Sequence, residues 1–297
     1  MTHRRAVLVM VAVTLMWSIA GVVSRQLEAA RSFEVTFWRS SFNALGLVVL
    51  LAWLRGPAPL MRSLREGGRT LWLSGLCWSV MFTAFMVAIT LTTVANVLVT
   101  MAMAPLLTAL IARLVLGHRL PTRTWGAIVV AGAGIAWMYA GEVRGADAQQ
   151  VLGTLVAAAV PLASAINWSL IQANRDARAD MLPAVLIGAA LSALITWPLS
   201  LPFAASTHDL GLLALLGVVQ LAIPCLMAVA CARVLSAPEI ALLALLEVIF
   251  GVAWAWLGAG EAPSSSVLVG GALVLGALAA NEAVALRRAP APLTDTP

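Results

Sequence analysis

The amino-acid sequence predicts an all-α membrane protein in which ten transmembrane helices form two inverted five-helix repeats, with both termini in the cytoplasm. Composition, a series of apolar runs and the distribution of arginine lead to this prediction. Hydrophobic residues make up 62% of the 297 residues and charged residues 10%, whereas a soluble domain is about half apolar and about a quarter charged. So few charged residues cannot cover a surface exposed to water, and we expect the chain to lie in a bilayer.

Polar or Pro/Gly breaks divide the chain into apolar runs, each close to the roughly 20 residues with which a helix crosses a bilayer. The ten runs are 6–24, 33–54, 71–91, 94–116, 123–140, 151–172, 182–203, 210–233, 237–258 and 265–286. The first follows Arg4 and Arg5 as a signal peptide would, but its length, Trp17 and the later spans favour a retained helix. No charge marks the turn between the third and fourth runs, which is the least certain boundary.

Arginine supplies all 18 basic residues, and most of them lie between the runs. The connections assigned to the cytoplasm hold Arg4, Arg5, Arg55, Arg62, Arg65, Arg69, Arg113, Arg119, Arg123, Arg175, Arg178, Arg233, Arg287 and Arg288. The opposite side holds only Arg25, Arg31 and Arg144. This asymmetry predicts two cytoplasmic termini in a multi-pass protein of the inner (cytoplasmic) membrane. Because the arginines do not line one face, we expect no nucleic-acid partner.

Weak internal repetition divides the chain into halves, residues 1–145 and 146–288, followed by a Pro-rich tail, 289–297, that we expect to be disordered. Trp17-Ser18 recurs as Trp168-Ser169, and Gly75 recurs as Gly217, in the same order. Since each half has an odd number of helices, the second half must enter the membrane from the opposite side. The repeat is therefore predicted to be inverted, as in many secondary transporters.

Short motifs keep a fixed order over nearly the whole chain. They are Leu15-Met16-Trp17-Ser18, Phe37-Trp38-Arg39, the stretch from Ala95 through Pro105 to Gly117, Trp125-Gly126, Gly132-x-Gly134, the stretch from Ala237 to Leu246-Glu247, Gly260-Glu261-x-Pro263 and Gly270-Gly271. This order resembles the drug/metabolite transporter superfamily, specifically its EamA-type branch of ten-helix proteins. Two positions depart from the family pattern: His118 stands where Glu is usual, and Val248 stands where Pro is frequent. The resemblance implies transport of small metabolites, amino acids among them, without ATP hydrolysis.

Two ionisable residues lie inside apolar runs. Glu247 is near the middle of the ninth run, where an acidic residue costs roughly 2.5–3.5 kcal/mol. We interpret it as a candidate for substrate binding and proton coupling, with a purely structural tie between helices as the alternative. Arg39 lies inside the second run, and three roles are open. The first is that its side chain extends to the outer membrane surface, the second that it pairs with Glu247, and the third that it binds a substrate carboxylate.

Aromatic and amide side chains complete the candidate substrate-binding site. They are Trp17, Asn43, Trp78, Phe82, Asn96, Asn167 and Trp168, with Gln220 as a further amide at membrane depth. In the resembled fold, the helices that carry these aromatics line a central cavity. Aromatics and amides together suit a small amphipathic solute. The alternative for each residue is ordinary helix packing or an interhelical hydrogen bond.

The sequence has no Ser/His/Asp set, phosphate-binding Gly-Lys loop or HExxH stretch, so we expect no enzyme, catalytic residue, cofactor or metal site. Cys77, Cys225 and Cys231 lie in apolar runs and are expected to fill the core. The prediction is a secondary transporter, a monomer or homodimer in membrane lipid, that moves a small-molecule substrate by alternating access. Export is favoured over import, and proton coupling stays open. The alternative is a flippase for a lipid or a lipid-linked solute.

Overall fold

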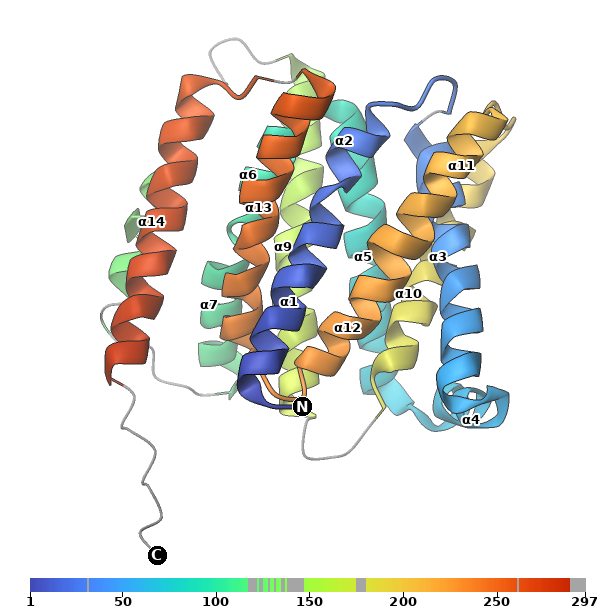
Figure 1. The fold of residues 1–297 in the computed structure, drawn as a ribbon, viewed down its shortest axis with the longest axis horizontal. Helices are drawn as coiled ribbons and strands as arrows, with labels where there is room; N and C mark the ends of the chain where they lie inside the picture. Colours follow the sequence, from blue (N-terminus) through green and yellow to red (C-terminus); the bar gives the residue numbers. More distant parts are fainter. Residues whose placement is uncertain are drawn as a thin grey trace, which may run out of the picture.

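The computed structural model describes residues 1–30, 32–116, 122, 125–127, 129–130, 132–134, 137, 147–174, 180–260 and 262–288. All regular elements in these ranges are helices, and most of them run side by side along one direction (Figure 1). This arrangement confirms the all-helical class. Arg31, His118, Arg144, Glu261 and the tail 289–297 lie outside the described residues.

Eight helical segments in the described ranges are long and apolar enough to cross a membrane. They are His3–Ser24, Phe33–Arg55, Gly68–Leu91, Val94–Ile111, Ala148–Ala173, Leu182–Ser200, Thr207–Cys231 and Glu239–Ala259. Each coincides with a predicted run. The described residues of the fifth run, within Trp125–Gly134, are helical, and the tenth run lies in α14 (Ser265–Arg288), a helix of 24 residues. A membrane bundle is therefore confirmed, and the count of ten stays a prediction.

Five of these segments are continuous helices, namely α3 (Ser32–Arg55), α5 (Gly68–Leu91), α9 (Ala148–Ala173), α10 (Leu182–Ser200) and α13 (Ala237–Ala259). Three are interrupted. The interrupted spans are α1 (His3–Ser18) with α2 (Ala20–Ser24), α6 (Val94–Met101) with α7 (Ala104–Leu116), and α11 (Thr207–Leu215) with the π-helix η1 (Leu216–Ala222) and α12 (Ile223–Cys231). Pro105 and Pro224 lie at two of the interruptions, as expected of a residue that lacks an amide hydrogen.

The turn between the third and fourth spans, which the sequence left uncertain, consists of Thr92 and Thr93. The Thr93 hydroxyl accepts a hydrogen bond from the amide of Asn96 at 3.2 Å and so caps α6. The guanidinium of Arg25 donates to the main-chain oxygens of Ile89 and Thr92, both at 3.2 Å. A cation thus closes the carboxyl end of α5, where the helix dipole favours positive charge.

The first residues of α1 and the last residues of α14 lie at the same end of the bundle (Figure 1). We call this the inner end, because the arginine-rich segments at Arg4, Arg55 and Arg233 belong to it. A short helix that the sequence analysis did not predict, α4 (Pro57–Glu66), also lies there, crosswise at the foot of α3 (Figure 1). The shared end agrees with the predicted orientation of the two termini.

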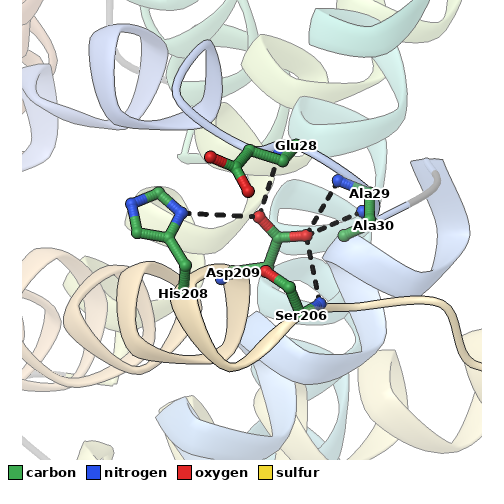
Figure 2. A network of polar contacts seen from close by, with 6 residues as sticks. All are labelled: Glu28, Ala29, Ala30, Ser206, His208 and Asp209. Atoms are coloured by element: carbon green, nitrogen blue, oxygen red, sulfur yellow. Dashed lines mark hydrogen bonds and ion pairs between the residues drawn. The ribbon is translucent and has the colours of Figure 1, made fainter.

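Two carboxylates hold the loops at the opposite, outer end. Asp209, at the start of α11, accepts hydrogen bonds from the amides of Glu28, Ala29 and Ala30 at 2.9–3.0 Å (Figure 2). Glu34, at the start of α3, accepts in turn from the amides of residues 204 and 205 at 2.8–3.0 Å. Asp209 therefore binds the α2–α3 loop, which precedes Glu34, and Glu34 binds the α10–α11 loop, which precedes Asp209. These hydrogen bonds join the two loops.

Candidate functional site

A cavity of about 100 Å³ lies between α1, α3, α5, the α6–α7 junction, α9, the η1–α12 segment and α13. Both halves of the chain therefore contribute to it. Its lining residues are Trp17, Arg39, Trp78, Met81, Phe82, Phe85, Met101, Ala104, Val160, Pro161, Ser164, Trp168, Gln220, Leu221, Cys225, Ala241, Ala244, Leu245, Glu247 and Val248. Most of this wall is apolar or aromatic, with a few polar groups at defined points, as in binding sites for small amphipathic ligands.

The cavity brings together most of the predicted site residues, namely Trp17, Arg39, Trp78, Phe82, Trp168 and Glu247. It does not include the predicted asparagines Asn43, Asn96 and Asn167, all of which are buried elsewhere in the bundle. The asparagines were assigned from their depth in the sequence alone. Depth does not determine which face of a helix a side chain occupies.

Two of these asparagines join helices. Asn167 on α9 accepts a hydrogen bond of 2.6 Å from the hydroxyl of Ser74 on α5. Asn96 donates to the hydroxyls of Thr92 and Thr154, both at 3.0 Å, and so joins the α5–α6 turn to α9. Both therefore make the interhelical hydrogen bonds that were the alternative interpretation.

Asn43, the third asparagine, lies on α3 one turn after Arg39 and is fully buried. Neither its amide nitrogen nor its amide oxygen has a hydrogen-bond partner among the described residues. It is therefore a buried polar group next to the site and not part of the cavity wall.

Arg39 projects into the bundle and not toward the outer surface. Its side chain is 2% exposed, so the predicted alternative in which its guanidinium reaches the membrane surface is wrong. Nη2 donates to Oε1 of Gln220 at 2.8 Å, and the guanidinium carbon lies 5.6 Å from the ring centroid of Phe85, a cation–π contact. Nε and Nη1 have no hydrogen-bond partner within the described part of the chain. Two donors of a buried cation thus stay unsatisfied.

Gln220 connects Arg39 to the interruption between α1 and α2. Its Nε2 donates to the main-chain oxygen of Trp17 at 3.1 Å while its Oε1 accepts from Arg39. Gln220 lies in η1, whose wider i→i+5 turns are frequent at functional sites. The sequence named Gln220 only as an amide at membrane depth, since a π-helix has no reliable signature in a single apolar run.

Gly217 lets η1 approach α3 closely. A Cβ at this position would lie 2.6 Å from Cβ of Phe42 and 2.7 Å from the main-chain oxygen of Arg39. Real Cβ atoms do not approach backbone atoms so closely, and only glycine fits without displacing α3. The contact fixes the position of η1 beside Arg39.

Glu247 is the acidic group of the cavity. Its side chain is 7% exposed and, across the described residues, it has neither a hydrogen bond nor an ion pair. It therefore does not pair directly with Arg39, although both line the same cavity. Helix α13 runs without interruption past Glu247, in agreement with Val248 at the position where the resembled family frequently has Pro.

Aromatic rings form one wall of the cavity. The rings of Trp78 and Trp168 pack edge to face, with centroids 5.7 Å apart and planes at 85°. The ring centroids of Trp78 and Phe82 are 5.5 Å apart. Phe85, Met101, Ser164 and Cys225 extend the lining, and the sequence had not marked them as site residues. Cys225 was expected to fill the core; it is buried but also borders the cavity.

No group of three or more His, Cys, Asp and Glu in the described ranges is arranged to hold a metal ion. The polar groups that the cavity offers include the guanidinium of Arg39, the carboxyl of Glu247, the Gln220 amide, the Ser164 hydroxyl and the indole N–H of Trp78, which has no partner among the described residues. Such a set can bind a charged or zwitterionic solute by hydrogen bonds and ion pairing.

Comparison with known proteins supports the resemblance suggested by the motifs. A solved structure titled "Crystal structure of protein" aligns with a TM-score of 0.69 and 19% identity over 96% of this chain and 100% of its own length. At that identity the similarity shows the fold alone, which extends through both halves. The search of curated proteins gave no match. Residues 4–140 match the model of the EamA-like transporter family. This match covers slightly less than half of the chain, and over these residues the chain is similar to the EamA-like transporter family, a family of membrane transporters for small solutes.

Proposed function

We propose that this chain is a secondary transporter that moves a small amphipathic metabolite with a carboxylate, such as an amino acid, across the cytoplasmic membrane. The observation that carries the proposal is the buried guanidinium of Arg39, which leaves Nε and Nη1 without partners at the wall of a cavity. A buried charge with unsatisfied donors is costly. A substrate carboxylate that accepts hydrogen bonds from this guanidinium would reduce that cost.

The other end of the solute would meet Glu247 and the aromatic wall. Glu247 can accept hydrogen bonds from an amine, or carry a proton when the cavity is empty. Its position without a partner among the described residues supports both roles. Trp78, Phe82 and Trp168 would cover the apolar part of the solute. The same arrangement makes Glu247 our candidate for proton coupling.

Alternating access requires two related conformations, and the helix contacts support an inverted repeat that would supply them. If α1, α3, α5 and α7 correspond to α9, α10, α12 and α13, the contacts occur in matching pairs. The contact of α5 with α9 matches that of α12 with α1. The contact of α1 with α13 matches that of α9 with α7. The contact of α5 with α10 matches that of η1, which precedes α12 in the same span, with α3. Gly75 lies against Ile187 of α10, while its counterpart Gly217 lies against α3. If the two repeats exchanged their conformations, the cavity would open first to one side of the membrane and then to the other.

The experiment is transport by the purified protein in liposomes, with a panel of amino acids and related carboxylates. Uptake and efflux are measured with and without an imposed pH gradient. We expect transport of at least one carboxylate, its loss in Arg39→Gln, and normal rates in Arg113→Gln, a control that removes an exposed arginine outside the cavity. If the protein is an exporter, transport from its cytoplasmic side to its outer side should be faster than transport in the reverse direction. Unchanged carboxylate transport by Arg39→Gln would exclude Arg39 as the receptor.

A further inference from the structure

Helix α4 differs from every other described helix in its surroundings. None of its residues is buried, and it lies crosswise at the inner end of the bundle, at the foot of α3 (Figure 1). Leu60 and Leu64 pack against the edge of the core, whereas Met61, Arg62 and Arg65 are exposed. An amphipathic helix with this distribution is suited to the layer between lipid headgroups and acyl chains.

Two glycines, one at each end of α4, set its direction across the bundle. Gly56, which connects α3 to α4, has φ +83°, and Gly68, which begins α5, has φ +61°. Both values are in the left-handed region, which favours glycine. The chain therefore turns sharply at both ends of α4, and the backbone conformation of these two glycines determines where α4 lies.

Exposed tryptophans flank α4 on both neighbouring helices. Trp53, on the last turns of α3, is 80% exposed, and Trp72, on the first turns of α5, is 51% exposed. Tryptophan concentrates at the level of the headgroups. The two residues place α4 at the inner surface of the bilayer.

The charges on this segment are available to a ligand. Within the described ranges, Arg62, Arg65 and Arg69 are exposed and have no ion pair, whereas Arg55 and Arg233 both contact Asp180. Guanidinium groups bind phosphate through paired hydrogen bonds. Basic residues on an interfacial helix attract the anionic lipids of the inner leaflet.

We propose that Arg62, Arg65 and Arg69 form a binding surface for the phosphate of an anionic phospholipid, whose acyl chains pass beside Met61 and Trp53. This surface is separate from the cavity, and no lining residue of the cavity belongs to it. The proposal therefore does not depend on the transported solute.

The test measures lipids retained by the purified full-length protein, with native mass spectrometry after addition of phosphatidylglycerol or phosphatidylcholine. We expect the native protein to retain phosphatidylglycerol preferentially. The triple variant Arg62→Gln/Arg65→Gln/Arg69→Gln should bind it at least about tenfold more weakly, since each arginine near the surface contributes about 1 kcal/mol. The control Arg4→Gln/Arg5→Gln/Arg113→Gln removes equal charge from exposed positions at the same end and should retain it.

Equal retention by the two triple variants would overturn the proposal, as would equal retention of phosphatidylcholine by the native protein. Release of the lipid by inorganic phosphate would indicate a general phosphate site and would also overturn it. If the triple variant does not fold, as judged by size-exclusion chromatography, the double variant Arg62→Gln/Arg65→Gln provides the same comparison.

Discussion

Gln220 holds Arg39 by a hydrogen bond of 2.8 Å between Oε1 and Nη2, and is itself fixed through its Nε2 to the main-chain oxygen of Trp17. The two bonds join α3, η1 and α1 at the wall of the cavity. Gln220 takes a donor of Nη2, which leaves Nε and Nη1 without partners among the described residues. Gln220 thus acts as a positioning residue for the carboxylate site that we propose.

Replacement of Gln220 by Leu should disturb the orientation of Arg39 without removing its charge. We expect KM for the carboxylate substrate to rise by about tenfold, the value of one hydrogen bond to a charged group, with a smaller change in the maximal rate. Gln220→Glu should weaken binding further, because a carboxylate beside Arg39 competes with the substrate. The measurement is initial uptake into liposomes over a range of substrate concentrations. If Gln220→Leu changed the maximal rate alone, the positioning role would be wrong.

Replacement of Arg39 by Lys keeps the positive charge but removes the paired donors. Lysine offers a single ammonium group in place of the planar guanidinium with its several donors. We expect Arg39→Lys to bind the carboxylate substrate at least about tenfold more weakly than the native protein. Binding by isothermal titration to the purified protein decides the point. Native affinity in Arg39→Lys would show that charge alone suffices.

Replacement of Gly217 by Ala should destabilise the contact between η1 and α3. The added Cβ would lie 2.6 Å from Cβ of Phe42, and overpacking of this kind costs about 1–3 kcal/mol. Gly211→Ala is a matched control on the preceding helix α11, because a Cβ there meets nothing within 4 Å. Thermal unfolding in detergent should show a lower midpoint for Gly217→Ala and an equal or higher one for Gly211→Ala. Equal midpoints in the two variants would contradict the close packing.

The sequence predicted most of the fold because apolar runs and arginine distribution act over whole helices. The helix α4 was missed since its short, mixed sequence resembles a polar connection. The three asparagines were misplaced for a different reason. Their depth could be read from the sequence, but the rotation of α3, α6 and α9 about their axes depends on packing with helices far away in the chain.

The same limit applied to Arg39, whose three possible roles differed only in the direction of its side chain. Its hydrogen bond to Gln220 spans 181 residues and depends on the π-turns of η1, for which the sequence offered no signal. The aromatic residues Trp17, Trp78, Phe82 and Trp168 were placed correctly along the cavity. That placement came from the family resemblance and not from their spacing.

Replacement of Asp209 by Ala should release the outer loops from one another. Its carboxylate accepts hydrogen bonds from the amides of Glu28, Ala29 and Ala30 and caps α11 together with Ser206 (Figure 2). Loss of hydrogen bonds to a buried charged acceptor costs about 1.5–3 kcal/mol each, partly recovered when the amides bind water. We therefore expect a lower unfolding midpoint and faster amide exchange at residues 28–30, measured by hydrogen–deuterium exchange.

The control for this change is His208→Gln, at an adjacent and exposed position whose ring lies 3.9 Å from the Asp209 carboxylate. It should leave exchange at residues 28–30 unchanged, because the amides contact Asp209 and not the imidazole. If the outer loops must separate during transport, Asp209→Ala should also alter the balance between the two conformations of the carrier. Exchange that stayed as slow in Asp209→Ala as in His208→Gln would mean that other contacts hold the loop.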